Sequence, residues 1–519
     1  MGVQVNNRVA HPSMLGRLEW ETVWVAEKNP KPLRSRAPES SAFHHFMTTG
    51  WSDHPQHDAT RSAVADYAAQ RREKLIASCD ELPQNQILII PAGAPKQRSN
   101  DTDYPYRPHS AFSHLTGWGS ATTPSSVLRI DLGSTPAEVV LFARGPAGRE
   151  SDEFYASADL GEFWTGPRPH LEDIAVGLGV EVRELDQWDG ISDADLARTI
   201  VLPDGDPLLS ERVRARRLKE LGVKRTRECE SWDAALAQAL SELRFVKDEW
   251  ELQQMRLAVD VTHRGFNDIV EALPRAIGHE RGERLIEGVF GARARLEGND
   301  VGYGTISASG PHACILHWVT NDGPVSDGDL LLVDAGIELD SLYTADITRT
   351  IPVSGTFTDQ QRLVYEAVLE AADVAMARVK PGVPFRAIHD AAMEVIARHV
   401  DSWGFLPVSQ EEALSTQGGQ HRRYMIHGTS HHLGLDVHDC AKARREMYVD
   451  QELKPGMVFT VEPGLYFQPD DLTVPAQWRG IGVRIEDNIV VTHDGYVNLS
   501  AGIPRSVAEV EAWVKDSRG

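Results

Sequence analysis

Two patterns of hydrophobic and polar positions divide the chain into two main regions. In the first, RSAVADYAAQRREKLIASC has apolar residues at helical spacing, and a second helical patch is expected near ADLARTI. Short apolar runs between and around them are typical of buried strands: NQILIIPAG, SSVLRIDL, AEVVLFA and TIVLP. The alternation predicts an α/β domain over residues 56–243.

The second predicted domain, residues 244–519, opens on a long amphipathic helical stretch that starts near Ser241. Strand patterns then alternate with long helical ones, which is typical of an α+β domain with hairpins. The strand patterns are DLLLVDAGIEL, YTADITRTIPV, MVFTVEPGLYF and GIGVRIEDNIVVT. Residues 1–55 are rich in Pro, Ser, His and Trp without clear periodicity, so we expect an extension that wraps another domain or another subunit.

Composition excludes several classes of function. The formal charge of −23 repels nucleic-acid phosphates and anionic lipids, so neither is an expected partner. No apolar run approaches the roughly 18 residues of a membrane span, and MGVQVNNRVAHPSMLG does not resemble a secretory signal, so we expect a cytoplasmic protein. The cysteines are far apart and form no C-x-x-C pair, which predicts ordinary buried thiols.

Five residues of the second domain are candidate metal ligands: Asp334, Asp346, His431, Glu462 and Glu486. Each has an ordinary explanation alone, such as a cap, an ion-pair partner, a core histidine or, before Pro463, a turn residue. Together they indicate more, because a carboxylate within an apolar strand needs neutralising partners to offset its desolvation. In the hairpin VDAGIELDSLYTADITRT, by contrast, Glu338 and Asp340 are expected to be solvated turn residues.

Electrostatics indicates which partners such carboxylates need. Two like charges about 4 Å apart repel by roughly 4 kcal/mol at an effective dielectric constant near 20, so four converging carboxylates require cations. Four carboxylates and an imidazole form a hard ligand set that suits Mn²⁺, Co²⁺ or Zn²⁺ and can hold a pair of ions about 3.5–4 Å apart. A hydroxide held between such ions is a nucleophile at neutral pH.

Further histidines accompany this set. The run IHGTSHHLGLDVHD contains His427, His431, His432 and His438, and His317 lies in ACILHW. The interleaved leucine and valine residues favour a cavity lining over an exposed loop. Imidazoles in such a cavity can orient a substrate and move protons near pH 7.

Four ordered motifs resemble those of the M24 metallopeptidases, which have the pita-bread catalytic fold, and in particular the aminopeptidase P (Xaa-Pro aminopeptidase) group. These motifs are DAGIELDSLYTADITRT, HGTSHHLGLDVHD, FTVEPGLY and GVRIEDNIVVT, and RSNDTDYPYRPHSAFSHLTGW resembles the N-terminal domain of that group. The resemblance implies a dinuclear-metal aminopeptidase that releases the first residue of peptides with proline in second position. It also implies a homo-oligomer, either a dimer or a tetramer, and Mn²⁺ is the first choice of metal.

The resemblance implies roles for the matching residues. Asp334 and Asp346 would hold one metal, Asp346 and Glu486 would bridge both, and His431 and Glu462 would complete the second site. His431 is the implied ligand rather than His432, because the family's ligand lies seven residues before the last histidine of the motif, 438 − 431 = 7.

The remaining implied roles concern the substrate. His317, His427 and His438 would line its pocket and stabilise the tetrahedral intermediate. Glu462 would also carry a proton to the leaving proline nitrogen, and Arg484 would support the bridging carboxylates.

Two departures from the family pattern bear on the site. The separation 346 − 334 = 12 is one residue longer than the family spacing, and we expect the added residue in the turn around Glu338–Leu342. His432 stands where relatives often have a large aromatic residue, which concerns substrate preference.

Several alternatives remain open. The nearest is a prolidase, which cuts only Xaa-Pro dipeptides with the same ligand set. A methionine aminopeptidase fits poorly because of the large N-terminal domain. A non-catalytic binding protein or a metal-independent creatinase-like enzyme on this fold would be expected to lack one or more of the ligands.

Overall fold

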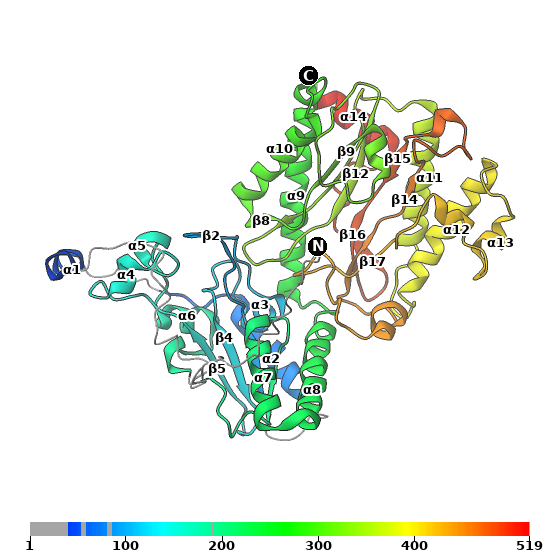
Figure 1. The fold of residues 1–519 in the computed structure, drawn as a ribbon. Helices are drawn as coiled ribbons and strands as arrows, with labels where there is room; N and C mark the ends of the chain where they lie inside the picture. The colour runs from blue at the N-terminus through cyan, green and yellow to red at the C-terminus, as the bar shows by residue number, and fades with distance from the viewer. Residues whose placement is uncertain (1–39, 53–58, 80–85, 189, 518–519) are drawn as a thin grey trace, which may run out of the picture.

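The computed structural model describes residues 40–52, 59–79, 86–188 and 190–517, which form two domains, each built around β-sheet (Figure 1). The chain passes from one to the other between α8 (Gly222–Glu242) and α9 (Glu249–Ala276). Most of the expected N-terminal extension lies outside the described residues. Within it, α1 (Ser41–Thr48) packs Phe43 against Tyr155 of the first domain, with ring centroids 5.8 Å apart.

A five-stranded mixed sheet forms the centre of the first domain. Its order is β6-β5-β4-β1-β7, with β1 antiparallel to β4 and parallel to β7. The strands are β1 (Ile87–Pro91), β4 (Val127–Asp131), β5 (Glu138–Ala143), β6 (Glu181–Glu184) and β7 (Thr199–Val201). Leu88 and Ile90 pack on one face and Ile87 and Ile89 on the other, as the alternation of strand side chains requires. The four strands predicted from apolar runs are confirmed.

Helices cover both faces of this sheet. The larger core cluster draws on α2, α3, α6 and α8, and the opposite cluster draws on α7. Together with α8, the helices of this domain are α2 (Val64–Ser78), α3 (Ser110–Thr116), α4 (Asp152–Ala156), α5 (Glu162–Thr165), α6 (Leu171–Leu178) and α7 (Pro207–Glu220). A small hairpin, β2 (Gln97–Ser99) and β3 (Thr102–Asp103), lies beside them.

The predicted helical patch near ADLARTI is wrong, because residues 193–198 form turns that lead directly into β7. Local side-chain bonds explain the difference. The hydroxyl of Ser192 donates to Asp195, and the hydroxyl of Thr199 donates to the backbone carbonyl of Asp195. Such bonds compete with a helix that is too short to repay its nucleation.

The second domain has two three-stranded sheets and two two-stranded ones, between the helix pairs α9–α10 and α11–α12 (Figure 1). The sheets are β12-β10-β9, β13-β16-β17, β11-β8 and β14-β15. The strands are β8 (Asp300–Val301), β9 (Ile306–Ser309), β10 (Leu330–Ala335), β11 (Ile337–Glu338), β12 (Ile347–Pro352), β13 (Val458–Val461), β14 (Gly464–Tyr466), β15 (Gly482–Arg484), β16 (Asp487–Val491) and β17 (Tyr496–Asn498). The remaining helices are α10 (Gly282–Glu297), α11 (Asp359–Met376), α12 (Arg386–Ser402), α13 (Gln410–Leu414) and α14 (Val507–Ser517).

Side-chain alternation on β10 determines which residues face the interior of the second domain. Leu331 and Val333 pack in the cluster with α9 and α10, whereas Leu330 and Leu332 pack in the cluster with α11 and α12. Asp334 therefore shares the α11 side of the sheet. The ladder to β12 pairs Asp334 with Thr348 and has no register shift, so the longer hairpin leaves both strands regular.

The turn of this hairpin differs in part from the prediction. It accommodates its length with Leu342 in the left-handed conformation, at φ 70°. Asp340 is exposed, as expected. Glu338 is only 5% exposed and pairs with Arg107 at 2.7 Å, so the prediction that it is solvated is wrong. The sequence alone does not reveal that the first domain covers this turn.

Two general predictions can be compared with the structure. All four cysteines are buried thiols, as predicted. Among the described residues, no helix has both the length and the apolar character that a membrane crossing requires.

Candidate metal centre

The five predicted ligands come from separate strand ends that meet at one place. Asp334 lies near the end of β10 and Asp346 directly precedes β12, while Glu462 follows β13 and Glu486 lies between β15 and β16. The segment with His431 runs alongside β13, where the amide of Thr460 donates to the His431 carbonyl at 2.9 Å. Pairing between these strands and segments therefore brings the five predicted ligands close to one another.

Distances between side chains show how closely the ligands approach one another. His431 Nε2 lies 3.2 Å from Asp346 Oδ2, 3.6 Å from Glu462 Oε1 and 4.0 Å from Glu486 Oε1. Asp334 joins through Tyr303, whose hydroxyl oxygen lies within hydrogen-bond distance of both Asp334 Oδ1, at 2.7 Å, and Asp346 Oδ1, at 2.5 Å. One ligand atom each from Asp346, His431 and Glu486 lie within 4.8 Å of one another, a spacing that a single cation could span.

The electrostatics of this cluster favour bound cations. Burial, and then the charge of Asp334, raise the pKa of Asp346 well above its usual value. The pKa of Glu486 is raised by burial and by Asp346, and that of Glu462 by burial and by Glu486. These shifts arise because uncompensated anions repel one another in a poorly solvated place. A buried set of carboxylate oxygens with one imidazole fits hard divalent ions, so the residues present are suited to the group that the sequence predicts.

Arg484 connects the ligands from one side. Its guanidinium donates to Asp334 at 2.6 Å, to the hydroxyl of Tyr466 at 3.1 Å and to that of Thr348 at 3.1 Å. Thr348 in turn donates to Glu486 at 2.7 Å. Arg484 therefore contacts Asp334 directly. Of the two carboxylates predicted to bridge the metals, it reaches Glu486 only through Thr348.

The predicted pocket histidines lie around the cluster in different environments. His427 Nε2 is 2.7 Å from the Tyr466 hydroxyl, and burial together with Arg484 lowers the pKa of His427 to about 3. The ring of His438 lies 4.3 Å from that of His431, between centroids, and burial lowers its pKa to about 4, with His431 and His317 contributing. His317 lies in an exposed loop after the 3₁₀ turn Gly310–Cys314. His427 and His438 are therefore neutral at pH 7.

Three polar residues of this centre escaped the sequence analysis: Tyr303, Thr348 and Tyr466. Thr348 and Tyr466 lie inside quoted motifs, but nothing in the motif identifies them as partners of a carboxylate and an arginine. Tyr303 lies outside every motif, between two glycines in VGYGT. No local pattern distinguishes it from a core tyrosine.

Comparison with known proteins identifies the family of the chain. A model of metallopeptidase family M24 matches residues 253–493, and a model of the aminopeptidase P N-terminal domain matches residues 68–201. Xaa-Pro aminopeptidase 2 of Streptomyces coelicolor is 49% identical over 476 residues, which are 90% of this chain and 95% of that protein. The chain belongs to the M24 metallopeptidase family.

Other members of the M24 family extend this relationship to solved structures. The Xaa-Pro aminopeptidase of Escherichia coli is 31% identical over 88% of this chain and 99% of that protein. The structure of Pseudomonas aeruginosa aminopeptidase PepP aligns with a TM-score of 0.74 at 31% identity, over 88% of this chain and 99% of that one. Zinc-substituted E. coli aminopeptidase P in complex with product aligns with a TM-score of 0.73 at 29% identity, over 88% and 100%. The predicted α/β domain followed by a pita-bread domain is confirmed.

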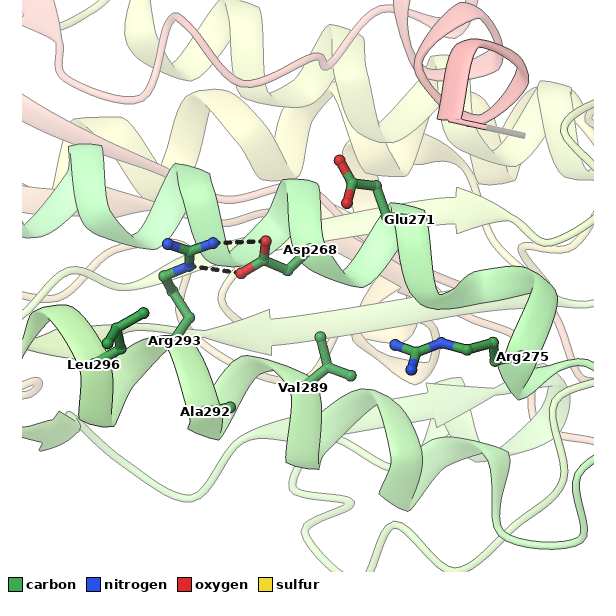
Figure 2. A pocket seen from close by; sticks show the side chains of 7 residues that line it. All are labelled: Asp268, Glu271, Arg275, Val289, Ala292, Arg293 and Leu296. Atoms are coloured by element: carbon green, nitrogen blue, oxygen red, sulfur yellow. Dashed lines mark hydrogen bonds and ion pairs between the residues drawn. The ribbon is translucent and has the colours of Figure 1, made fainter. Parts of the chain in front are cut away.

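A hollow lies on the surface of this M24 domain, between α9 and α10 (Figure 2). Arg293 crosses it and pairs with both carboxylate oxygens of Asp268, at 2.6 and 2.8 Å. Its lining residues are Asp268, Glu271, Arg275, Val289, Ala292, Arg293 and Leu296, and none of them is a predicted ligand. The hollow is therefore separate from the candidate metal centre.

Proposed function

We propose that the protein removes the N-terminal residue from peptides whose second residue is proline, using two divalent metal ions. The observation that carries this proposal is the convergence of four carboxylates and His431 in a buried cluster within an M24 domain. Its relatives named Xaa-Pro aminopeptidase, 45–49% identical over about 90% of the chain, support the substrate class.

In this proposal Asp334 and Asp346 would hold one ion, Asp346 and Glu486 would be shared by both, and His431 and Glu462 would complete the second position. When bound, the ions supply Lewis-acid polarisation of the peptide carbonyl and activation of water at neutral pH. Mn²⁺ is the expected metal, with Co²⁺ and Zn²⁺ as alternatives, because oxygen donors dominate the set.

The chain's own residues would bind the peptide and move the proton. Glu462 Oε2 lies 3.6 Å from His427 Nδ1, so this carboxylate would be placed to accept a proton and pass it to the leaving proline nitrogen. His317, His427 and His438 would line the pocket and stabilise the oxygen of the attacked carbonyl. Arg484 would keep Asp334 and Glu486 oriented.

A prolidase remains the nearest alternative, and peptide length separates the two. We expect the metal-loaded protein to release glycine from Gly-Pro-Pro. Cleavage of Gly-Pro with no cleavage of Gly-Pro-Pro would instead assign a dipeptidase. Failure to cleave either peptide, with metals bound, would favour a binding protein on this fold.

Three broader predictions belong to the same proposal. We assign residues 1–55 to an extension, 56–243 to the N-terminal domain and 244–519 to the catalytic domain, a division supported by the break between α8 and α9. Assembly as a dimer or tetramer stays a prediction, which light scattering of the purified protein would measure. A cytoplasmic location also stays a prediction, which cell fractionation would measure.

A further inference from the structure

Two connecting segments touch each other: one joins two predicted ligands, and the other joins a predicted ligand to a predicted pocket histidine. The hairpin turn, residues 336–345, joins Asp334 to Asp346. The histidine loop, residues 432–437, joins His431 to His438. The amide of Thr344 in the hairpin turn donates to the carbonyl of Gly434 in the histidine loop at 3.1 Å. A shift in either segment would therefore move ligands or pocket residues on both sides.

Arg107, from the N-terminal domain, contacts both segments at once. Its Nε donates to Glu338 of the hairpin turn at 2.7 Å, and its Nη2 donates to the carbonyl of Leu435 in the histidine loop at 2.5 Å. Its Nη1 donates to Ser110, whose hydroxyl donates to Asp436 of the same loop at 2.5 Å. One guanidinium thus links Glu338, which is 231 positions from Arg107 in the sequence, to Leu435, which is 328 positions from it.

The surroundings make these contacts hard to replace. Glu338 is buried, and apart from Arg107 it accepts a bond from the Asn299 amide at 2.9 Å. Loss of Arg107 would leave a buried carboxylate without its cationic partner. A lysine could approach Glu338 as a point charge, but it lacks the planar fork that serves Glu338 and Leu435 together.

The far end of the histidine loop has a further anchor, and Arg244, which provides part of it, also pairs with Asp436 in the middle of the loop at 3.5 Å. Asp439 is buried and accepts bonds from Arg244 at 2.8 Å and from Lys247 at 3.1 Å. At the near end, His431 is fixed by pairing with β13. The middle of the loop, at Leu435 and Asp436, is where Arg107 and Ser110 of the N-terminal domain hold it.

We infer that Arg107 is a positioning residue for the metal centre: it holds the hairpin turn and the histidine loop together, so that the ligands they carry converge. It contacts none of the predicted ligands and acts through Glu338 and Leu435. The inference rests on the proposed metal centre and assigns to the N-terminal domain a part in building it.

Isothermal titration of the metal-free protein with Mn²⁺ tests this directly, without any assay of activity. We expect R107A to bind Mn²⁺ about 10–100-fold more weakly than the wild type, the usual effect of removing a group that orients metal ligands. E338Q should weaken binding in the same direction, and R107K should recover at most part of it. The double variant R107A/E338Q should be little worse than R107A, because the two changes break one interaction.

A matched control removes a different ion pair between the same two domains. Arg444 pairs with Glu242 at 2.7 and 2.8 Å, and neither residue belongs to the hairpin turn or the histidine loop. R444A should keep the wild-type Mn²⁺ affinity and the wild-type ratio of kcat to KM. In R107A we expect kcat to fall more than KM rises, because the ligands are displaced while the peptide-binding surface remains.

The possible results are distinguishable. A folded R107A with wild-type Mn²⁺ affinity overturns the inference and leaves the proposed function standing. A wild-type protein that binds no Mn²⁺, Co²⁺ or Zn²⁺ removes the proposed metal centre and the inference with it. If R107A does not fold, R107K and E338Q decide: wild-type isotherms in both overturn the inference, and weakened ones support it.

Discussion

Replacing His432 by phenylalanine should make the metal-free protein resist acid better. His432 is fully buried among aromatic rings, stacked on Phe385 at 4.5 Å and 21° and edge-on to Phe245 at 4.7 Å. Tyr448 and Phe459 complete this aromatic surround. Among the residues that the structure describes, neither ring nitrogen of His432 has a hydrogen-bond partner, so the side chain behaves as an apolar ring that carries two unpaired polar atoms.

The magnitude follows from the shifted pKa. Burial, and then the charge of Lys247, lower the pKa of His432 from 6.5 to about 3. A histidine whose pKa is lower in the folded state contributes stability that is complete above its unfolded pKa and is lost as the pH falls below that value. With an unfolded pKa near 6.5, the loss reaches about 2 kcal/mol at pH 5. H432F lacks this titration, so its stability relative to the wild type should rise by about that amount between pH 7.5 and pH 5.

Two effects of opposite sign determine the pH-independent difference in stability between H432F and the wild type. Unpaired buried nitrogens each cost about 1–3 kcal/mol, which phenylalanine removes. The slightly larger ring opposes this gain through overpacking, by about 1–3 kcal/mol. The pH-dependent difference is therefore the decisive quantity.

The assay is urea unfolding in the presence of chelator, at pH 7.5 and at pH 5, for the wild type, H432F and a control. The control is H493Q, which removes an exposed histidine. We expect H493Q to follow the wild type at both pH values. An H432F curve that shifts with pH as much as the wild type would refute the reasoning.

Two further predictions concern the metal centre. D346A should abolish metal occupancy, measured by elemental analysis, because Asp346 is the carboxylate proposed to contact both ions; a fully metallated and active variant would contradict that assignment. R484M should lower kcat/KM of the metal-loaded protein by about 10–100-fold. In the presence of chelator it should lower the free energy of unfolding by about 3–5 kcal/mol, since the buried carboxylate of Asp334 then has neither a metal ion nor its arginine partner. Steady-state kinetics and thermal unfolding measure both effects, and wild-type kcat/KM in R484M would show that the orientation of Asp334 does not depend on Arg484.

Much of the fold and the predicted ligands could be read from local patterns, for a physical reason. Strands such as β1 and β10 bury nearly every residue, so their apolar runs stand out from the neighbouring turns. Asp334 and Glu486 attract attention because a charge in such a run requires compensation. The helical patch near ADLARTI failed because Ser192 and Asp195 supply local bonds that periodicity does not register.

Two residues that support the centre, Tyr303 by direct contact with ligands and Arg107 by the inferred contact through Glu338, could not be read in this way. Tyr303 and Arg107 act through contacts with residues far away in the sequence, and neither has a neighbour that indicates its role. Glu338 was misassigned for the same reason, because a glutamate near a turn is solvated unless another domain covers it. Tertiary contacts of this kind become visible only when both segments are placed in space.

The most direct measurement of the central claim is hydrolysis of Gly-Pro-Pro before and after metal removal. The wild-type protein, stripped by chelator and dialysed, should release no glycine, and addition of Mn²⁺ should restore release of free glycine. D346A should stay inactive under the same addition. Full release of glycine by the stripped protein, with no divalent ion added, would contradict the account.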